Sequence, residues 1–291
     1  MKTAAEKLRV IILTHGGAEA LLRRLLALDE VIIAGVFIET EVNRRAYTLR
    51  EKLERSIRYD GYAATAAKLL RRFFRRAAPD ESETVRIGQA QQRLCEMAAR
   101  HNVPVQYVTN YHSASAIATM RRAEADLGII WGTNILKEPV FSIPRLGSIN
   151  LHQGLAPYYR GGPPVFWELF NDESEVGITV HFVAPKVDTG DIIVQQRVPL
   201  AYDYSYGLDY ERFIADFRAR MAERCAQAMT EAVRMIATGT AEPVRQDISL
   251  GQRYRLPVKR EKDEMRRRLR ERARTRQKLI HNTVQGTGEA Q

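Results

Sequence analysis

Residues 146–191 decide the fold, and they read LGSINLHQGLAPYYRGGPPVFWELFNDESEVGITVHFVAPKVDTGD. A short apolar strand ends in Asn150-Leu151-His152. Because successive side chains of an extended strand alternate faces, Asn150 and His152 point the same way and Leu151 points into the core. A Gly/Pro-rich turn, a short helix and a second strand then lead to Asp188, within reach of the His152 imidazole. The stretch predicts a carboxamide, an imidazole and a carboxylate together at a strand end.

Three features of this stretch together resemble the folate-dependent formyltransferases, which include methionyl-tRNA, glycinamide ribonucleotide and nucleotide-sugar enzymes. They are the Asn-x-His pair at 150–152, the Leu-x-Pro-x-x-Arg-Gly-like turn at 155–161, and the Asp-Thr-Gly-Asp loop at 188–191 after an apolar strand. The resemblance is clearest over 126–200 and weaker over 8–38. It implies an enzyme that uses 10-formyltetrahydrofolate as formyl donor and needs no metal.

The chemistry of formyl transfer suits these three side chains. Transfer to an amine passes through a tetrahedral intermediate with charge on oxygen, which needs hydrogen-bond donors and a route for the proton. Asn150 is predicted to donate to that oxygen, and protonated His152 to donate to it and act as general acid toward the leaving nitrogen. Asp188 is expected to orient His152 and favour its imidazolium. The resemblance assigns the same roles; without it, a strand-end Asn and His are more often structural.

Two loops are expected to hold the folate. The first follows the strand predicted at 126–131, beyond the carboxyl end where such sheets bind ligands, although it also fits a simple turn. The second would meet the pterin ring largely through its backbone. The resemblance places in these loops Asn134, Ile135, Leu136, Val183 and Val187.

The turn between the two central strands is predicted to bind an anionic substrate. Arg160 offers a guanidinium, and Gly161 and Gly162 offer uncovered backbone N–H groups. The same residues also fit a tight turn before a helix that starts at Pro163. His181 alternates with apolar residues on a strand and is expected to be structural. The turn at 15–17 lacks the GxGxxG pattern, so a dinucleotide site is not expected.

The rest of the chain predicts an α/β fold. The apolar run 8–14 is typical of a strand buried on both faces of a parallel sheet. A helix at about 18–28 and a second strand at 31–38 complete a right-handed βαβ unit. With further strands at 104–108 and 126–131, the pattern indicates a doubly wound, Rossmann-like, mostly parallel sheet with helices on both faces.

Two segments extend this core. Residues 39–101 are predicted to be a helical insertion of amphipathic helices, either packed on the sheet edge or contacting a partner or membrane surface. The catalytic domain is expected at 1–205. The remaining residues 206–291 are expected to form a C-terminal unit. It consists of a long helix that runs from about 205 to 238 and is capped by Gly239, a short extended segment, and a basic helix from 259 that frays by Val284.

Charge and cysteine content limit the possible partners. The net charge is +10, but +7 of it lies in 259–278, where eleven Lys/Arg face four acids. Any interaction with a polyanion would therefore depend on this segment. Cys95 and Cys225 are interpreted as buried free thiols, which favours the cytoplasm. No apolar run approaches the ~20 residues of a membrane span.

The predicted function is N-formyl transfer from 10-formyltetrahydrofolate to a primary amine. The 53 residues after the long helix are too short for the five-stranded barrel that follows the core in methionyl-tRNA formyltransferases. A small or nucleotide-linked amino sugar is therefore the favoured acceptor. The alternatives are a methionyl-tRNA formyltransferase-like enzyme, with tRNA as a possible partner, and a non-catalytic binding module.

Overall fold

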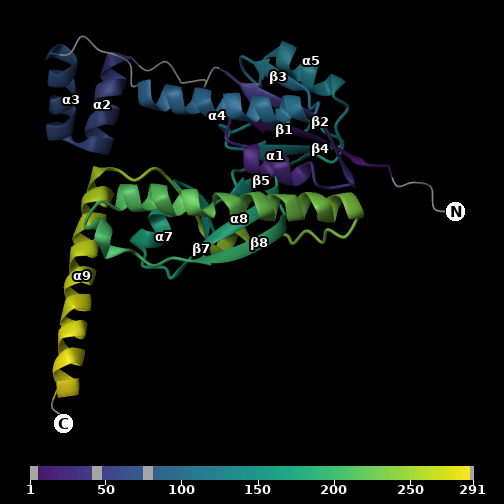
Figure 1. The fold of residues 1–291 in the computed structure, drawn as a ribbon. Coiled ribbons are helices and arrows are strands. Elements are labelled where there is room, and N and C mark those ends of the chain that lie inside the picture. Colours follow the sequence, from purple (N-terminus) through teal and green to yellow (C-terminus); the bar gives the residue numbers. More distant parts are fainter. Residues whose placement is uncertain (1–5, 41–47, 75–80, 289–291) are drawn as a thin grey trace.

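The computed structural model describes residues 6–40, 48–74 and 81–288. Its centre is a seven-stranded sheet with the order β3-β2-β1-β4-β5-β7-β8 (Figure 1). The first five strands in this order are parallel, and β7 and β8 are antiparallel to their neighbours. The predicted doubly wound, mostly parallel sheet is therefore confirmed. The strands are β1 (Leu8–Thr14), β2 (Val31–Glu39), β3 (Val105–Val108), β4 (Leu127–Trp131), β5 (Ser148–His152), β7 (Glu175–Phe182) and β8 (Ile192–Pro199).

Helices cover both faces of the sheet because alternate residues of its strands are apolar on each side. In β1, Val10 and Ile12 pack with the larger core on one face, and Ile11 and Leu13 pack with a smaller core on the other. The larger core includes side chains of α1 (Glu19–Leu25), α4 (Glu81–Arg100) and α8 (Tyr210–Thr238). The smaller core includes those of α5 (Ala114–Arg122) and α6 (Glu138–Phe141).

Helix α8 belongs to this main core and not to a separate C-terminal unit. Its buried face, which includes Phe213, Phe217 and Met229, packs with the apolar side chains of α1, β7 and β8. The helix starts at Tyr210, later than the predicted 205, because Asp209 accepts a hydrogen bond from Arg212 N as its N-cap. Residues 204–206 form the 3₁₀ turn η1 instead. Gly239 ends α8 in a left-handed conformation (φ 70°), as predicted.

The segment predicted as an insertion contains three helices: α2 (Leu49–Asp60), α3 (Tyr62–Phe74) and α4. Helix α4 runs along α1, but α2 and α3 form a hairpin that stands off the sheet beside the start of α9 (Figure 1). Lys262 Nζ of α9 lies 3.9 Å from Asp60 Oδ1, and Lys68 Nζ lies 2.7 Å from Asp60 Oδ2. The prediction that all these helices pack on the sheet edge is therefore wrong for α2 and α3. Side chains of the 70–76 part of the LLRRFFRR run lie outside the described residues.

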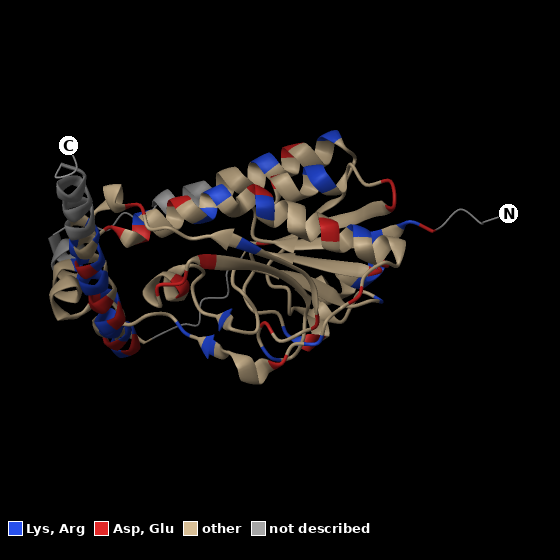
Figure 2. Cartoon of the chain, turned by 90° about the horizontal axis from the view of Figure 1, so that it is seen from below, with Lys and Arg blue, Asp and Glu red and all other residues tan. Residues whose placement is uncertain are grey.

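The basic helix α9 (Lys259–Gly288) is continuous past the predicted fraying point at Val284. Met265 and Leu269 are fully buried, and the Arg268 guanidinium carbon lies 4.1 Å above the Phe170 ring of α7 (Phe166–Phe170). Acidic and basic residues alternate along its exposed side (Figure 2). The first half of α9 is therefore an integral part of the fold.

Before α9, a second, two-stranded parallel sheet pairs β6 (Tyr159–Gly161) with β9 (Gln252–Tyr254). The rings of Tyr159 and Tyr254 stack at 5.1 Å and 7°. A 3₁₀ turn, η2 (Ile248–Leu250), precedes β9. This small sheet brings the C-terminal segment against the Gly161-Gly162 turn.

Candidate active site

The site forms at the end of β5, where β5 lies between a parallel and an antiparallel neighbour. Asn150 and His152 alternate with Leu151 on this strand, and Leu151 packs against the main core. In the antiparallel β5–β7 pair, Asn150 lies directly opposite His181. Directly opposed residues of antiparallel strands project from the same face, so His181 joins Asn150 and His152.

Asp188 lies between the two histidines. Its Oδ2 is 3.4 Å from His152 Nδ1, and its Oδ1 is 3.4 Å from His181 Nε2. The backbone N–H of Gly161 donates to Oδ2 at 2.9 Å. Asp188 adopts a left-handed conformation (φ 51°), which a non-glycine residue reaches at a cost that its surroundings must offset. The carboxylate is thus held from three sides.

The electrostatics of this group favour an ionised carboxylate beside a neutral imidazole. Burial alone would raise the pKa of Asp188, but the adjacent His181 and His152 rings and the Gly161 N–H hold it well below its ordinary range. Burial lowers the pKa of His152, and it outweighs the opposing effects of Asp188 and the Tyr159 carbonyl. Asp188 favours the imidazolium, as expected, but the effect of burial is larger and the pKa of His152 stays below its ordinary value.

The second ring nitrogen of His152 defines its tautomer. His152 Nε2 lies 2.7 Å from the Tyr159 carbonyl oxygen, which can only accept a hydrogen bond. Nε2 therefore carries the proton, and the neutral ring keeps a lone pair at Nδ1 beside Asp188. A proton taken up at Nδ1 would be stabilised at once by the carboxylate.

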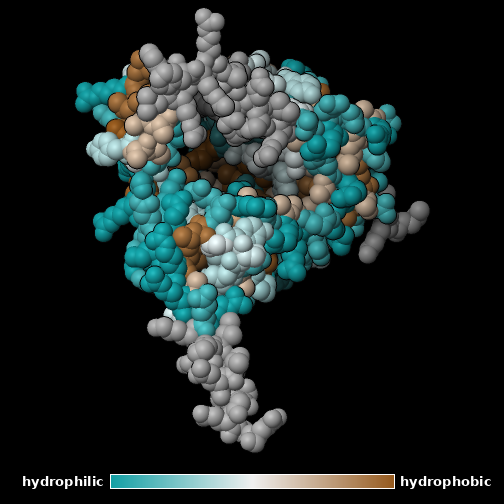
Figure 3. Space-filling model, turned by 60° about the vertical axis from the view of Figure 1, so that its left-hand side comes forward, coloured by the Kyte–Doolittle hydropathy of each residue, from teal (hydrophilic) through white to brown (hydrophobic). Residues whose placement is uncertain are grey.

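A cavity of about 860 Å³ opens over these side chains, and its hollow, partly apolar floor is visible in Figure 3. Asn150, His152, His181 and Asp188 all line it. The residues of both predicted folate loops lie in the same wall: Asn134, Ile135, Leu136, Val183 and Val187. The structure therefore brings the predicted catalytic and folate-binding residues into one cavity.

Arg160 does not join them. It is 8% exposed, and its guanidinium donates to the backbone carbonyls of Pro157, Ile248 and Gly251 at 3.1–3.4 Å. With its donors used inside the protein and its side chain absent from the cavity wall, it does not fit the predicted contact with an anionic substrate. It fastens the turn to the C-terminal segment instead.

Gly161 and Gly162 line the cavity and also allow the close approach of β9. Both have positive φ, 63° and 59°. A Cβ on Gly162 would lie 2.8 Å from Tyr254 Cβ, which is too close for two carbon atoms. Both the tight-turn interpretation and a cavity-lining position are therefore compatible with these two residues.

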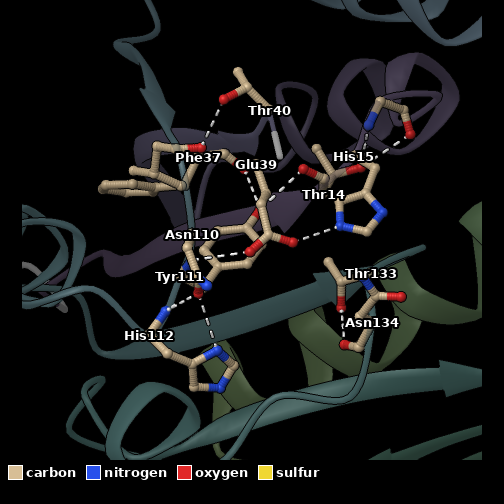
Figure 4. Close-up of polar contacts among 12 residues, drawn as sticks. Thr14, His15, Phe37, Glu39, Thr40, Asn110, Tyr111, His112, Thr133 and Asn134 are labelled. Carbon is tan, nitrogen blue, oxygen red and sulfur yellow. Dashed lines mark hydrogen bonds and ion pairs between the residues drawn. The ribbon is translucent and has the colours of Figure 1, made fainter. Parts of the chain in front are cut away.

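A second polar cluster ties together the ends of β1, β2 and the loop after β3 (Figure 4). Buried Glu39 accepts from His15 Nε2 at 2.8 Å and from Tyr111 N at 2.9 Å. The Tyr111 hydroxyl lies 2.9 Å from Thr14 O and 2.7 Å from Phe37 O. These bonds crosslink the loops that follow three neighbouring strands, so the edge of the sheet beside the Thr133–Asn134 loop is rigid.

Two parts of the cavity wall were not expected from the sequence. Tyr59 of α2 and residues 253–256 of the C-terminal segment face the same cavity as Asn150. His181, interpreted as structural, lies in the site because of the β5–β7 register. No local pattern identifies these residues, since each reaches the cavity through pairing or packing with distant elements.

The described residues contain neither a metal-ligand cluster nor a membrane-spanning helix. No group of three or more His, Cys, Asp or Glu side chains there has the arrangement of a metal site. None of the helices in the described ranges is long and apolar enough to cross a membrane. Cys225 is buried, whereas Cys95 is only partly buried, and both are free thiols.

Comparison with known proteins identifies the class to which this fold and site belong. Residues 81–223 match the formyl transferase family, so the chain carries a formyl transferase domain. The match begins at the first residue of α4 and leaves α2, α3, β9 and α9 outside it. The predicted resemblance to the formyltransferases is thereby confirmed.

Particular relatives are methionyl-tRNA formyltransferases. The chain is 38% identical to that of Bacteroides fragilis over 106 residues, which are 36% of this chain and 33% of that protein. It is 34% identical to that of Chlorobium chlorochromatii over 152 residues, which are 52% of this chain and 46% of that protein. The match spans only a third to a half of these relatives.

Solved structures share the fold. Glycinamide ribonucleotide transformylase 1 from Symbiobacterium toebii aligns with a TM-score of 0.53 and 19% identity, over 85% of this chain and 98% of that one. A 4-N formyltransferase from Francisella tularensis aligns with a TM-score of 0.52 and 14% identity, over 85% and 76%. At this identity the likeness concerns the fold.

Proposed function

We propose that this protein transfers a formyl group from 10-formyltetrahydrofolate to a primary amine. The observation that carries the proposal is the meeting of Asn150, His152 and Asp188 in one cavity within a formyl transferase domain. The apolar and backbone-lined loops at 134–136 and 183–187 suit a flat, uncharged ring such as a pterin. A non-catalytic binding module would not require the buried His152–Asp188 pair next to the Asn150 carboxamide, to which no described residue forms a hydrogen bond.

In the proposed reaction the amine nitrogen attacks the formyl carbon, and the bond from that carbon to N10 of the folate then breaks. No described residue engages the Asn150 carboxamide, so its N–H₂ is available to donate to the oxygen that becomes negative. Neutral His152 takes the proton of the attacking amine at Nδ1. The resulting imidazolium is stabilised by Asp188 and passes the proton to N10. The products are the formylated amine and tetrahydrofolate.

Histidine 181 has a positioning role in this scheme. Its Nδ1 donates to the Phe182 carbonyl oxygen at 2.7 Å, which fixes the ring, and its Nε2 faces Asp188. Together with Gly161 N it holds the carboxylate where the His152 imidazolium will form.

For the acceptor we propose a small or nucleotide-linked amino sugar. The basic helix α9 gives little support to a tRNA-binding surface over its first half, because Arg266, Arg267, Arg268 and Arg272 are engaged within the chain. Arg267 pairs with Glu264 and Glu271, and Arg272 donates to Leu169 O and pairs with Asp172. The methionyl-tRNA relatives favour the second candidate, a methionyl-tRNA acceptor.

Two measurements test the proposed function. The stable analogue 5-formyltetrahydrofolate is expected to raise the melting temperature, because a ligand of the native state adds RT ln(1 + [L]/Kd) to its stability, and to raise it more than NAD or ATP does. A shift with NAD and none with the folate would contradict the proposal.

Tetrahydrofolate release from 10-formyltetrahydrofolate is then measured with a panel of nucleotide-linked amino sugars and with methionyl-tRNA. If the folate binds but tetrahydrofolate is released with neither acceptor, the protein binds folate without transferring the formyl group. That result would overturn the enzymatic assignment.

A further inference from the structure

Among the described residues of the cavity wall, one charged side chain has no partner. Among the lining residues the structure describes, the charged side chains belong to Asp188, Arg253 and Arg255. Asp188 is held by two histidines, and Arg255 pairs with Glu261 through both guanidinium nitrogens at 2.6 and 2.9 Å. No described residue pairs with Arg253, and its side chain is exposed to the cavity mouth.

The position of Arg253 is well defined. It lies on β9, which pairs with β6 and is locked by the Tyr159–Tyr254 stack. A Cβ built on Gly161 would lie 3.1 Å from Arg253 Cγ and 3.5 Å from its Nε. The side chain therefore extends over Gly161, whose N–H holds Asp188. The Arg253 side chain therefore starts next to the glycine whose N–H contacts Asp188.

The cavity wall also contains an aromatic side chain from α2. Tyr59 of α2 lines the cavity, and the guanidinium carbons of Arg55 and Arg58 lie 5.4 and 5.8 Å from its ring centre. Exposed Leu256 continues the apolar surface next to β9.

We infer that Arg253, with Tyr59 in the wall of the same cavity, forms a subsite for the anionic part of a substrate: a phosphate or a carboxylate attached to a flat or apolar group. The inference rests on the proposed function and names a recognition element outside the matched formyl transferase domain. A guanidinium binds such oxyanions through paired N–H donors, and a tyrosine ring offers a face for stacking. The two substrates of the proposed reaction supply the two sources of this chemistry: the glutamate carboxylates of the folate, and the phosphates of a nucleotide-linked acceptor.

The test measures binding to the full chain by calorimetry, with the variants Arg253→Gln and Arg253→Lys. The folate probes are 5-formyltetrahydrofolate and its pteroate analogue, which lacks the glutamate. The acceptor-side probes are UDP, GDP, dTDP and inorganic pyrophosphate. Removal of the charge is expected to weaken the anionic probe that uses the subsite on the order of tenfold to a hundredfold, and Arg253→Lys is expected to recover part of the loss. The matched control is Arg245→Gln, an exposed arginine of the same segment that does not line the cavity.

The pattern of losses identifies the source of the anion. Weaker binding of 5-formyltetrahydrofolate, with pteroate binding unchanged, assigns the subsite to the donor's carboxylates. Weaker binding of a nucleoside diphosphate, with both folates unchanged, assigns it to the acceptor. Wild-type affinity of Arg253→Gln for every probe overturns the inference while the proposed function stands. If the wild type binds no folate, and Arg253→Gln binds nucleotides more weakly than the wild type, the proposed function is contradicted and the subsite is supported.

Discussion

The backbone N–H of Gly161 donates to Oδ2 of Asp188 at 2.9 Å, so the glycine turn holds the carboxylate that faces both histidines. The turn was expected to bind substrate directly. Its amide instead stabilises the ionised form of Asp188, and the lowered pKa of that carboxyl depends on it together with the histidines. The same glycine lies under Arg253, so one residue connects the proposed chemistry with the mouth of the cavity.

Replacement of the proposed catalytic residues should lower turnover without loss of folate binding. His152→Ala and Asp188→Ala are each expected to reduce kcat by at least ~10², because each removes part of one proton-transfer and charge-stabilising unit. The loops at 134–136 and 183–187 remain, so the Kd for 5-formyltetrahydrofolate should be nearly unchanged. His101→Ala, at an exposed position, is the control. Turnover near that of the wild type in either variant would remove the catalytic assignment.

The pH dependence of turnover should show His152 as a base with a lowered pKa. The neutral form is the active one, so activity is expected to fall with decreasing pH only below about 6.5, the ordinary histidine value. Because Asp188 raises the pKa of His152, Asp188→Asn should move this acid limb to still lower pH, along with its loss of rate. The profile of kcat/KM against pH checks both points. An acid limb above 6.5 in the wild type would show that the charge of the carboxylate outweighs burial.

The buried carboxyl of Glu168, which has no role in the proposed reaction, predicts that the free energy of unfolding changes with pH. Burial raises the pKa of Glu168 to about 7, although backbone N–H groups oppose the shift. A raised pKa in the folded state means that stability is fully present below about 4.5 and is lost as pH rises through 7. Relative to the wild type, Glu168→Gln should therefore gain on the order of 2–3 kcal/mol between pH 5 and pH 8.

Urea unfolding at the two pH values measures this difference. Glu242→Gln, at an exposed position, should show no such trend. A difference between Glu168→Gln and the wild type that does not change with pH would mean that Glu168 ionises with an ordinary pKa despite its burial.

Gly161→Ala tests the link between the turn, Asp188 and β9. The substitution strains a φ of 63° at a cost of roughly 1–2 kcal/mol, and its Cβ would lie 3.0 Å from Tyr254 O and 3.1 Å from Arg253 Cγ. Gly207→Ala shares the φ strain (60°) but has no atom within 4 Å of the new Cβ. Gly161→Ala is therefore expected to lose more stability than Gly207→Ala, and to lower kcat as well. Equal losses with unchanged kcat would show that Asp188 does not depend on this turn.

The basic helix should behave as part of the core. Leu269 is fully buried on α9, and Leu269→Ala is expected to cost about 2–5 kcal/mol of unfolding free energy, as large-to-small substitutions in cores do. Arg274→Gln, farther along the helix, should leave stability within about 0.5 kcal/mol. A truncation after Pro257 would remove Met265 and Leu269 together. Loss of activity in that variant could therefore result from unfolding as well as from the loss of RNA contacts. A stable Leu269→Ala protein would show that α9 is only peripherally attached.

Local patterns were sufficient for much of the fold. The apolar runs predicted the parallel strands, and Gly239 predicted the end of the long helix. The common face of Asn150 and His152 followed from the two-residue period of a strand. Each of these properties depends on residues within a few positions of one another, and local geometry determines it.

The composition of the site depended on the tertiary structure. His181 enters it because β7 pairs with β5 in an antiparallel register that places it opposite Asn150, and Arg160 leaves it because carbonyls of a segment about 90 residues away take its donors. The net lowering of the His152 pKa could not be predicted from the sequence, because burial is the sum of all that packs around the ring. By itself the sequence determined which elements form and which side chains a strand end presents, since both are local. Only the packed structure decided which distant residues complete the cavity and which charge they carry, because pairing register and desolvation arise from contacts between segments far apart in the chain.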